Sequence, residues 1–131
     1  MSRRLLQIVV AILGLIPIGT GLAAFVLGPA HMPGGQPVLP SIDNEFRFLS
    51  VSWFSLGVMT YWMLPTIERQ TRLVRFLAAF IFVGGLGRLL SLLLLGAPHW
   101  SYSAAMCLEL IGMPLLVIWQ ASIAVDTEGG D

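Results

Sequence analysis

The chain has 131 residues, of which 56% are hydrophobic and 11% are charged, and its formal net charge is zero. A soluble domain carries about 25% charged residues, so this composition argues against a cytosolic enzyme and indicates a membrane protein. Neutral charge gives no field that would attract nucleic acid, and the single cysteine, Cys107, excludes an intrachain disulfide and a thiolate-rich metal site.

The first predicted element is an apolar helix from about Leu5 to Leu27. A membrane span needs about 20 mostly apolar residues, and this run satisfies that length. Arg3-Arg4 before an apolar run is also how a cleavable signal peptide begins. The run is longer than the apolar part of a usual signal peptide, so we expect a retained helix. Its glycines and Pro17 either allow close helix packing or help to frame a pocket.

A connection rich in proline and glycine follows over residues 28–45. Such a composition is incompatible with one continuous helix, and its length suggests a lid over the predicted bundle. His31 stands alone in it, so a metal site is not expected there.

The second predicted span runs from about Phe46 to Leu64. Asp43 or Asn44 is a favourable cap for its N-terminus, and Glu45 suits the positive first turn. A cation is unfavourable at that position. We therefore expect Arg47 to pair with Glu45, with Glu109 or with an external anionic group.

The third and fourth predicted spans run from about Leu73 to Leu95 and from about Trp100 to Val125. Arg88 and Glu109 lie inside them, at similar distances from the intervening turn. With a rise of 1.5 Å per residue, both sit about 10–15 Å below the same surface. A charge at mid-membrane costs about 2.5–3.5 kcal/mol on insertion scales. We therefore predict that Arg88 and Glu109 pair, directly or through water.

These spans predict an all-α fold, a single integral-membrane four-helix bundle covering residues 1–131. Period-two alternation, the mark of a membrane barrel, is missing from the sequence. The positive-inside rule places both termini in the cytoplasm and residues 28–45 outside, because most arginines flank the first span or join the second to the third: Arg3, Arg4, Arg69, Arg72 and Arg75.

The segment DNEFRF at residues 43–48 resembles the hallmark of a small bacterial integral-membrane family, domain of unknown function 4345. The segment GGLGRLLS at residues 84–91 is similar to the rest of that pattern, as are the Pro98-His99 turn, residues 108–110 and Trp119-Gln120. The resemblance implies four membrane helices and a bacterial inner membrane. It implies no activity, substrate or catalytic residue. At the level of the fold alone, the chain is also similar to four-helix membrane proteins of the DoxX kind.

Six polar residues in the outer half of the predicted bundle suggest a site for a small amphipathic or lipid-like ligand: Glu45, Arg47, Arg88, His99, Tyr102 and Glu109. Membrane lipids are the expected surroundings, and no cofactor, metal or nucleic acid is expected. An alternative function is an accessory or scaffold subunit that packs against a membrane partner or a second copy. A membrane-embedded enzyme with Glu109 or Glu45 as acid/base remains another alternative, although the sequence holds none of the common catalytic motifs.

Overall fold

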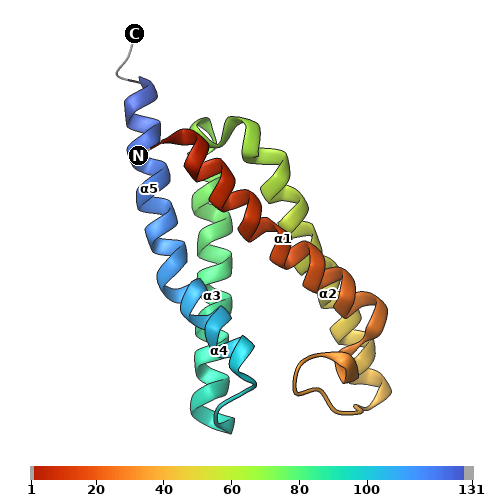
Figure 1. The fold of residues 1–131 in the computed structure, drawn as a ribbon. Helices are drawn as coiled ribbons and strands as arrows, with labels where there is room; N and C mark the ends of the chain where they lie inside the picture. The colour runs from red at the N-terminus through yellow and green to blue at the C-terminus, as the bar shows by residue number, and fades with distance from the viewer. Residues whose placement is uncertain (1, 129–131) are drawn as a thin grey trace. The chain divides into compact units, whose positions relative to one another are not determined.

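The structure is a computed structural model that describes the backbone of residues 2–128 and side chains up to residue 124. The described residues are almost entirely helical and contain no strand, so the predicted all-α class is confirmed (Figure 1). The long helices are α1 (Arg3–Leu27), α2 (Pro40–Met63), α3 (Thr71–Leu95) and a fourth that comprises α4 (Trp100–Cys107), a π-helical turn (Leu108–Gly112) and α5 (Met113–Glu128).

The chain forms two compact units. One comprises Gln7–Pro65, and the other comprises Met1–Leu6 together with Thr66–Asp131. Helix α1 therefore contributes its first residues to one unit and the rest of its length to the other. The expectation of a single four-helix domain stays a prediction.

In the unit Gln7–Pro65, glycines allow α1 and α2 to pack closely. A Cβ atom added to Gly21 would lie 2.7 Å from the backbone nitrogen of Phe54, and one added to Gly57 would lie 2.9 Å from that of Ile18. Small residues let apolar helices approach in this way. The Tyr61 hydroxyl also donates to the Ala11 carbonyl at 2.7 Å. Close packing of α1 against α2 is therefore one role of Gly21 in the first predicted span.

Helix α2 begins at Pro40, earlier than the predicted start near Phe46. The expectation that Asp43 or Asn44 caps its N-terminus is wrong. Leu39 occupies the cap position in an extended conformation, and Asp43 lies in the first turn. The physical reason is that proline at the first helical position and an acid in the first turn both favour the N-terminus of a helix. Neither residue needs to be apolar for this effect. The hydropathy pattern marks only the apolar part of α2.

In the other unit, α3 and α5 lie side by side (Figure 1). Helix α3 ends at Leu95, as predicted, before Gly96 with a φ of 91°. The start of α1 belongs to the same unit, and Leu6 in it is fully buried. The Arg3 guanidinium there lies 3.0 Å from the Glu68 carboxylate.

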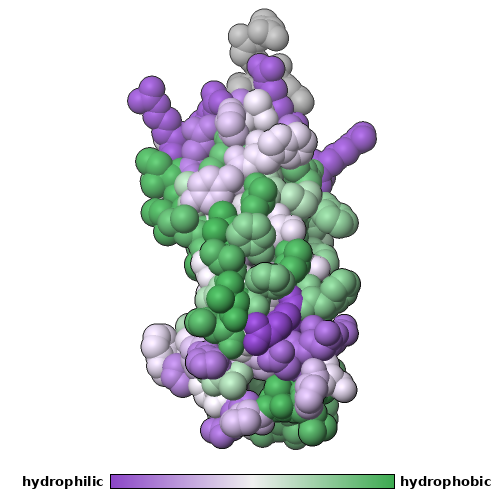
Figure 2. All heavy atoms as spheres, turned by 90° about the vertical axis from the view of Figure 1, so that its right-hand side faces the viewer, coloured by the Kyte–Doolittle hydropathy of each residue, from purple (hydrophilic) through white to green (hydrophobic). Residues whose placement is uncertain are grey.

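Three helical segments are long and apolar enough to cross a membrane: Arg3–Leu27, Thr71–Leu95 and Trp100–Ala124. Helix α2 has a similar length but is not among them, and it carries three charged side chains in its first eight residues. Its role as a span stays a prediction. Apolar side chains form a broad band on the face shown in Figure 2, with hydrophilic side chains gathered towards its ends.

Candidate functional site

The centre of the candidate site is an ion pair between α3 and the π-helical turn. The Arg88 Nε group donates to both carboxylate oxygens of Glu109, at 3.1 and 2.9 Å. Glu109 is buried, with 6% of its surface exposed. The structure therefore confirms the predicted pair, in its direct form.

Two local features bring Glu109 against α3. Pro114 has no N–H group, so the Leu110 carbonyl lacks its usual α-helical donor. A π-helical turn, in which hydrogen bonds run between residues i and i+5, covers Leu108–Gly112 and ends directly before Met113. On α3, a Cβ atom added to Gly85 would lie only 3.0 Å from the Glu109 Cβ. The glycine therefore leaves the room that Glu109 occupies.

The remainder of the Arg88 guanidinium is accessible. Its side chain is 36% exposed, and its central carbon lies 5.6 Å from the centre of the Tyr102 ring, within range of a cation–π interaction. Among the described residues, no group accepts a hydrogen bond from either Nη group of Arg88. The side chain is thus held through Nε and one ring, while two nitrogens remain available.

Arg47 is bound very differently. Its Nε donates to Asp43 Oδ2 at 2.7 Å, and its Nη1 donates to the carbonyls of Phe25 and Val26 at 2.7 and 2.9 Å. The expectation that Arg47 pairs with Glu45 or Glu109 is wrong. Asp43 lies one helical turn before Arg47 and shares its face, whereas a residue two positions away does not.

The carbonyls at the end of α1 also explain a cation near the start of α2. The C-terminus of a helix is its negative end, and Arg47 hydrogen-bonds that end of α1. Gly28 follows directly with a φ of 77°, and a Cβ there would lie 2.5 Å from Arg47 Nη2. The hydrogen bond from Arg47 lowers the pKa of Asp43 below its ordinary value. Asp43 and Arg47 therefore form a clamp between α1 and α2.

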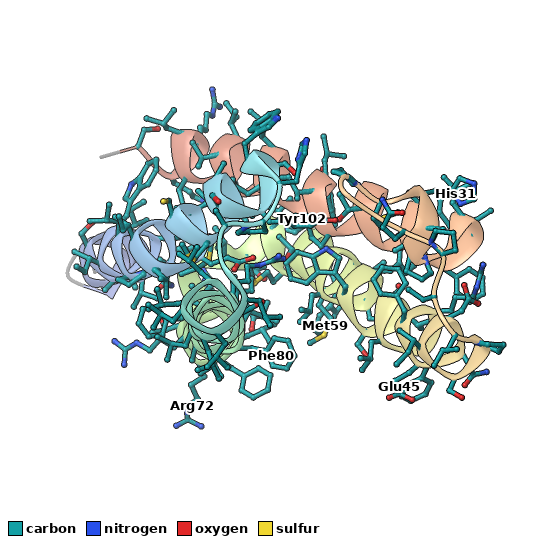
Figure 3. The ribbon with its side chains drawn as sticks, turned by 90° about the horizontal axis from the view of Figure 1, so that it is seen from below. His31, Glu45, Met59, Arg72, Phe80 and Tyr102 are labelled. Atoms are coloured by element: carbon teal, nitrogen blue, oxygen red, sulfur yellow. The ribbon has the colours of Figure 1, made fainter. Side chains whose placement is uncertain are left out.

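Glu45 and His99 do not contact an ion pair. Glu45 is exposed and projects away from α2 (Figure 3), and its carboxylate makes no hydrogen bond with any residue that the structure describes. His99 caps α4: its Nδ1 accepts from the backbone N–H of Ser101 at 3.4 Å and lies 2.9 Å from the Ser101 hydroxyl. A helix-capping role thus accounts for His99.

The model for a family described as Domain of unknown function (DUF4345) matches residues 5–120. The chain belongs to this family. The match includes the Arg88–Glu109 pair and the Asp43–Arg47 clamp of this DUF4345 protein. No curated protein and no solved structure matches the chain. The similarity to DoxX proteins stays a prediction.

The six predicted site residues of the DUF4345 protein separate into distinct groups. Arg88, Tyr102 and Glu109 lie together in one unit. Glu45 and Arg47 belong to the other unit, and His99 caps its own helix. The sequence therefore identified the central pair and the ring beside it.

An apolar cavity of about 200 Å³ lies between α1 and α2. Its lining contains no predicted ligand-binding residue and consists of non-polar residues: Gly21, Leu22, Phe25, Val51 and Phe54. This cavity differs in place and polarity from the polar one expected from the sequence.

Sequence reasoning missed a second polar cluster, at the other end of α3. Gln120 is fully buried, and its Nε2 donates to the Ile67 carbonyl at 3.0 Å and to the Thr71 hydroxyl at 3.1 Å. Glu68 beside it is 6% exposed. A glutamine within an apolar helix is a usable signal for such a cluster. Glu68, in contrast, lies beside arginines in a polar connection, where burial is not expected.

Proposed function

We propose that this DUF4345 protein is a multi-pass protein of the bacterial inner membrane that binds a small amphipathic or lipid-like molecule at Arg88. The observation that carries the proposal is an accessible guanidinium on a helix apolar enough to span a membrane. Charged residues within spans are expensive, and they usually serve a pathway or a ligand.

The unequal burial of the two partners supports binding over a purely structural pair. A pair with both partners sealed by side chains would offer a ligand no group to contact. Here Glu109 is buried, whereas Arg88 keeps a third of its side chain accessible. A ligand can therefore reach the arginine but not the carboxylate.

The arrangement gives less support to catalysis. Both oxygens of Glu109 already accept hydrogen bonds from Arg88, and Glu45 has no polar partner among the described residues. A general acid or base acts through a proton shared with the substrate. The only polar group that contacts either carboxylate among the described residues is the Arg88 guanidinium, which already occupies both oxygens of Glu109.

Arg88 lies seven residues before the end of α3, or about 10 Å along the helix axis. The proposed topology, with both termini in the cytoplasm, puts this end of α3 at the outer surface. Arg88 would then lie at the depth of the first part of the acyl chain of an amphiphile in the outer leaflet. Its polar group would contact the guanidinium, and its chain would remain in hydrocarbon.

Native mass spectrometry of the protein extracted in mild detergent tests the proposal. We expect wild-type protein to retain a small molecule, and the variant Arg88→Gln to retain about tenfold less. The matched control is Arg72→Gln, which removes an exposed arginine from the same helix and should leave retention unchanged. Equal retention by Arg88→Gln and wild type would disprove the proposal. A complex with a second protein or copy, without a small molecule, would instead support the accessory-subunit function.

A further inference from the structure

We infer that the polar group recognised at Arg88 is an anion, a carboxylate or a phosphate, that binds the two Nη groups. This inference rests on the proposed function and narrows its ligand to one chemical class. The inference follows from three observations. Arg88 has N–H donors without an acceptor among the described residues, Glu109 is buried, and the surface beside the pair is open.

The first step concerns the geometry of the guanidinium. Arginine presents five N–H donors in a rigid plane, and only Nε–H is engaged, by Glu109. The edge formed by Nη1 and Nη2 is therefore intact. Two parallel N–H groups match the two oxygens of a carboxylate or phosphate, and such bidentate pairs are the strong ones.

The second step excludes a cationic ligand. Glu109 is the negative group of the pair, but it is buried and both of its oxygens face Nε. The Glu109 side chain is only 8% exposed and both of its oxygens are already engaged, so it offers little to an ammonium group. The exposed charged group of the site is the Arg88 guanidinium, and N–H donors in an apolar environment are stabilised most by a charged acceptor.

The third step concerns room. Gly84 lies one turn before Arg88, and Gly87 directly precedes it. A Cβ atom added to either glycine would meet no other group within 4 Å. The surface of α3 beside the guanidinium is therefore open, in contrast to Gly85, which lies against Glu109. An anionic group and the first part of its chain fit along this surface.

The test uses the purified full chain in a maltoside detergent and a series of probes that share one C18 chain. The probes are oleic acid, oleyl phosphate and oleyl alcohol, with acetate and inorganic phosphate as chain-free anions. Binding is measured by native mass spectrometry over a concentration series. We expect the acid and the phosphate ester to bind at least about tenfold more tightly than the alcohol.

Variants identify the group responsible. Arg88→Gln should abolish the preference for the acid over the alcohol, and Arg88→Lys should weaken it, because lysine keeps the charge and loses the planar fork. Arg72→Gln should preserve it. Helical content by circular dichroism and a single size-exclusion peak identify variants that fold. Should Arg88→Gln fail to fold, the Arg88→Lys result decides the inference.

The outcomes distinguish this inference from the proposed function. Equal, Arg88-dependent binding of acid and alcohol would leave the proposed function in place and overturn the anion inference. Binding of the acid that persists unchanged in both Arg88 variants would overturn both. Competition by inorganic phosphate or acetate at the concentrations at which the oleyl probes bind would support the anion and identify a free anion, rather than a lipid headgroup, as its source.

Discussion

The two arginines that the sequence singled out have different surroundings. Arg47 donates four hydrogen bonds, to Asp43 and to the end of α1. Arg88 uses Nε alone. Arg47 stands in a polar stretch at the start of α2, whereas Arg88 stands inside the apolar helix α3. Hydropathy does not show how either side chain is bound. The difference depends on carbonyl groups supplied by another helix, which no local pattern reveals.

The pair of Arg88 and Glu109 should contribute to stability. Arg88→Gln leaves a buried carboxylate without its donor, and we expect a loss of about 1.5–3 kcal/mol. Adding Glu109→Gln should recover part of that loss, because it removes the stranded charge. Thermal unfolding in detergent measures all three variants as a double-mutant cycle. A double variant whose loss equals the sum of the two single losses would show that the pair does not contribute.

Neighbouring glycines on α3 offer a matched comparison. Gly85→Ala places a Cβ 3.0 Å from the Glu109 Cβ and from Leu110 Cδ2. We expect this substitution to destabilise the protein by about 1–3 kcal/mol, as overpacking does. Gly84→Ala meets open space and should be neutral or stabilising, since alanine favours helix by up to about 1 kcal/mol. Unfolding midpoints of the two variants check the prediction, and a Gly85→Ala protein as stable as Gly84→Ala would contradict it.

Among the elements, the fourth long helix has an irregularity whose location follows from the sequence but whose form does not. Pro114 deprives the Leu110 carbonyl of its α-helical donor, and the structure has its π-helical turn at this place. A proline in a helix can also be accommodated by a kink. The sequence could not choose between these responses, because the choice depends on the packing of Glu109 against Gly85 on α3.

The clamp between α1 and α2 should depend on pH. The Arg47 hydrogen bond lowers the pKa of Asp43. The stability it provides is therefore fully present above the ordinary carboxyl pKa and is lost as the pH falls through the lowered value. We expect Asp43→Asn to lower the melting temperature at pH 7, and to match wild type in the acid range where Asp43 is protonated.

Glu45→Gln is the control for the clamp. Glu45 lies two residues away, is exposed and has no hydrogen-bond partner among the described residues. Its substitution should change the melting temperature little at either pH. A pH-independent effect of Asp43→Asn, or an equal effect of Glu45→Gln, would mean that the clamp does not act through the charge of Asp43.

For the molecule as a whole, the apolar composition and continuous apolar runs predicted the all-α class. Residues that interrupt these runs predicted several helix boundaries. Gly96 and Trp100 mark the end of α3 and the start of α4 where expected. The predicted start of α2 near Phe46 is later than the observed start at Pro40. The first turn of α2 is polar, and a hydropathy pattern marks only apolar residues. The burial of Glu68 and Gln120 also escaped prediction, since it arises from contacts between segments about 50 residues apart.

The proposed topology has a direct test. In a Cys107→Ala background, a cysteine at Gln36 should react with a membrane-impermeant maleimide on intact cells. A cysteine at Thr66 should react only after the membrane is permeabilised. Both positions are exposed in the structure, so accessibility within the protein does not bias the comparison. Labelling of Thr66→Cys on intact cells would contradict cytoplasmic termini.

The four-residue link between α3 and α4 bears on biosynthesis. Gly96–His99 is all that separates two long apolar segments whose charges neutralise one another. In the proposed membrane topology, α3 leaving the translocon alone would expose an uncompensated Arg88 to lipid, at a cost of about 2.5–3.5 kcal/mol on insertion scales. We therefore expect the two segments to partition as one helical hairpin, with a chain truncated before Glu109 failing to integrate stably and becoming a substrate for membrane quality control.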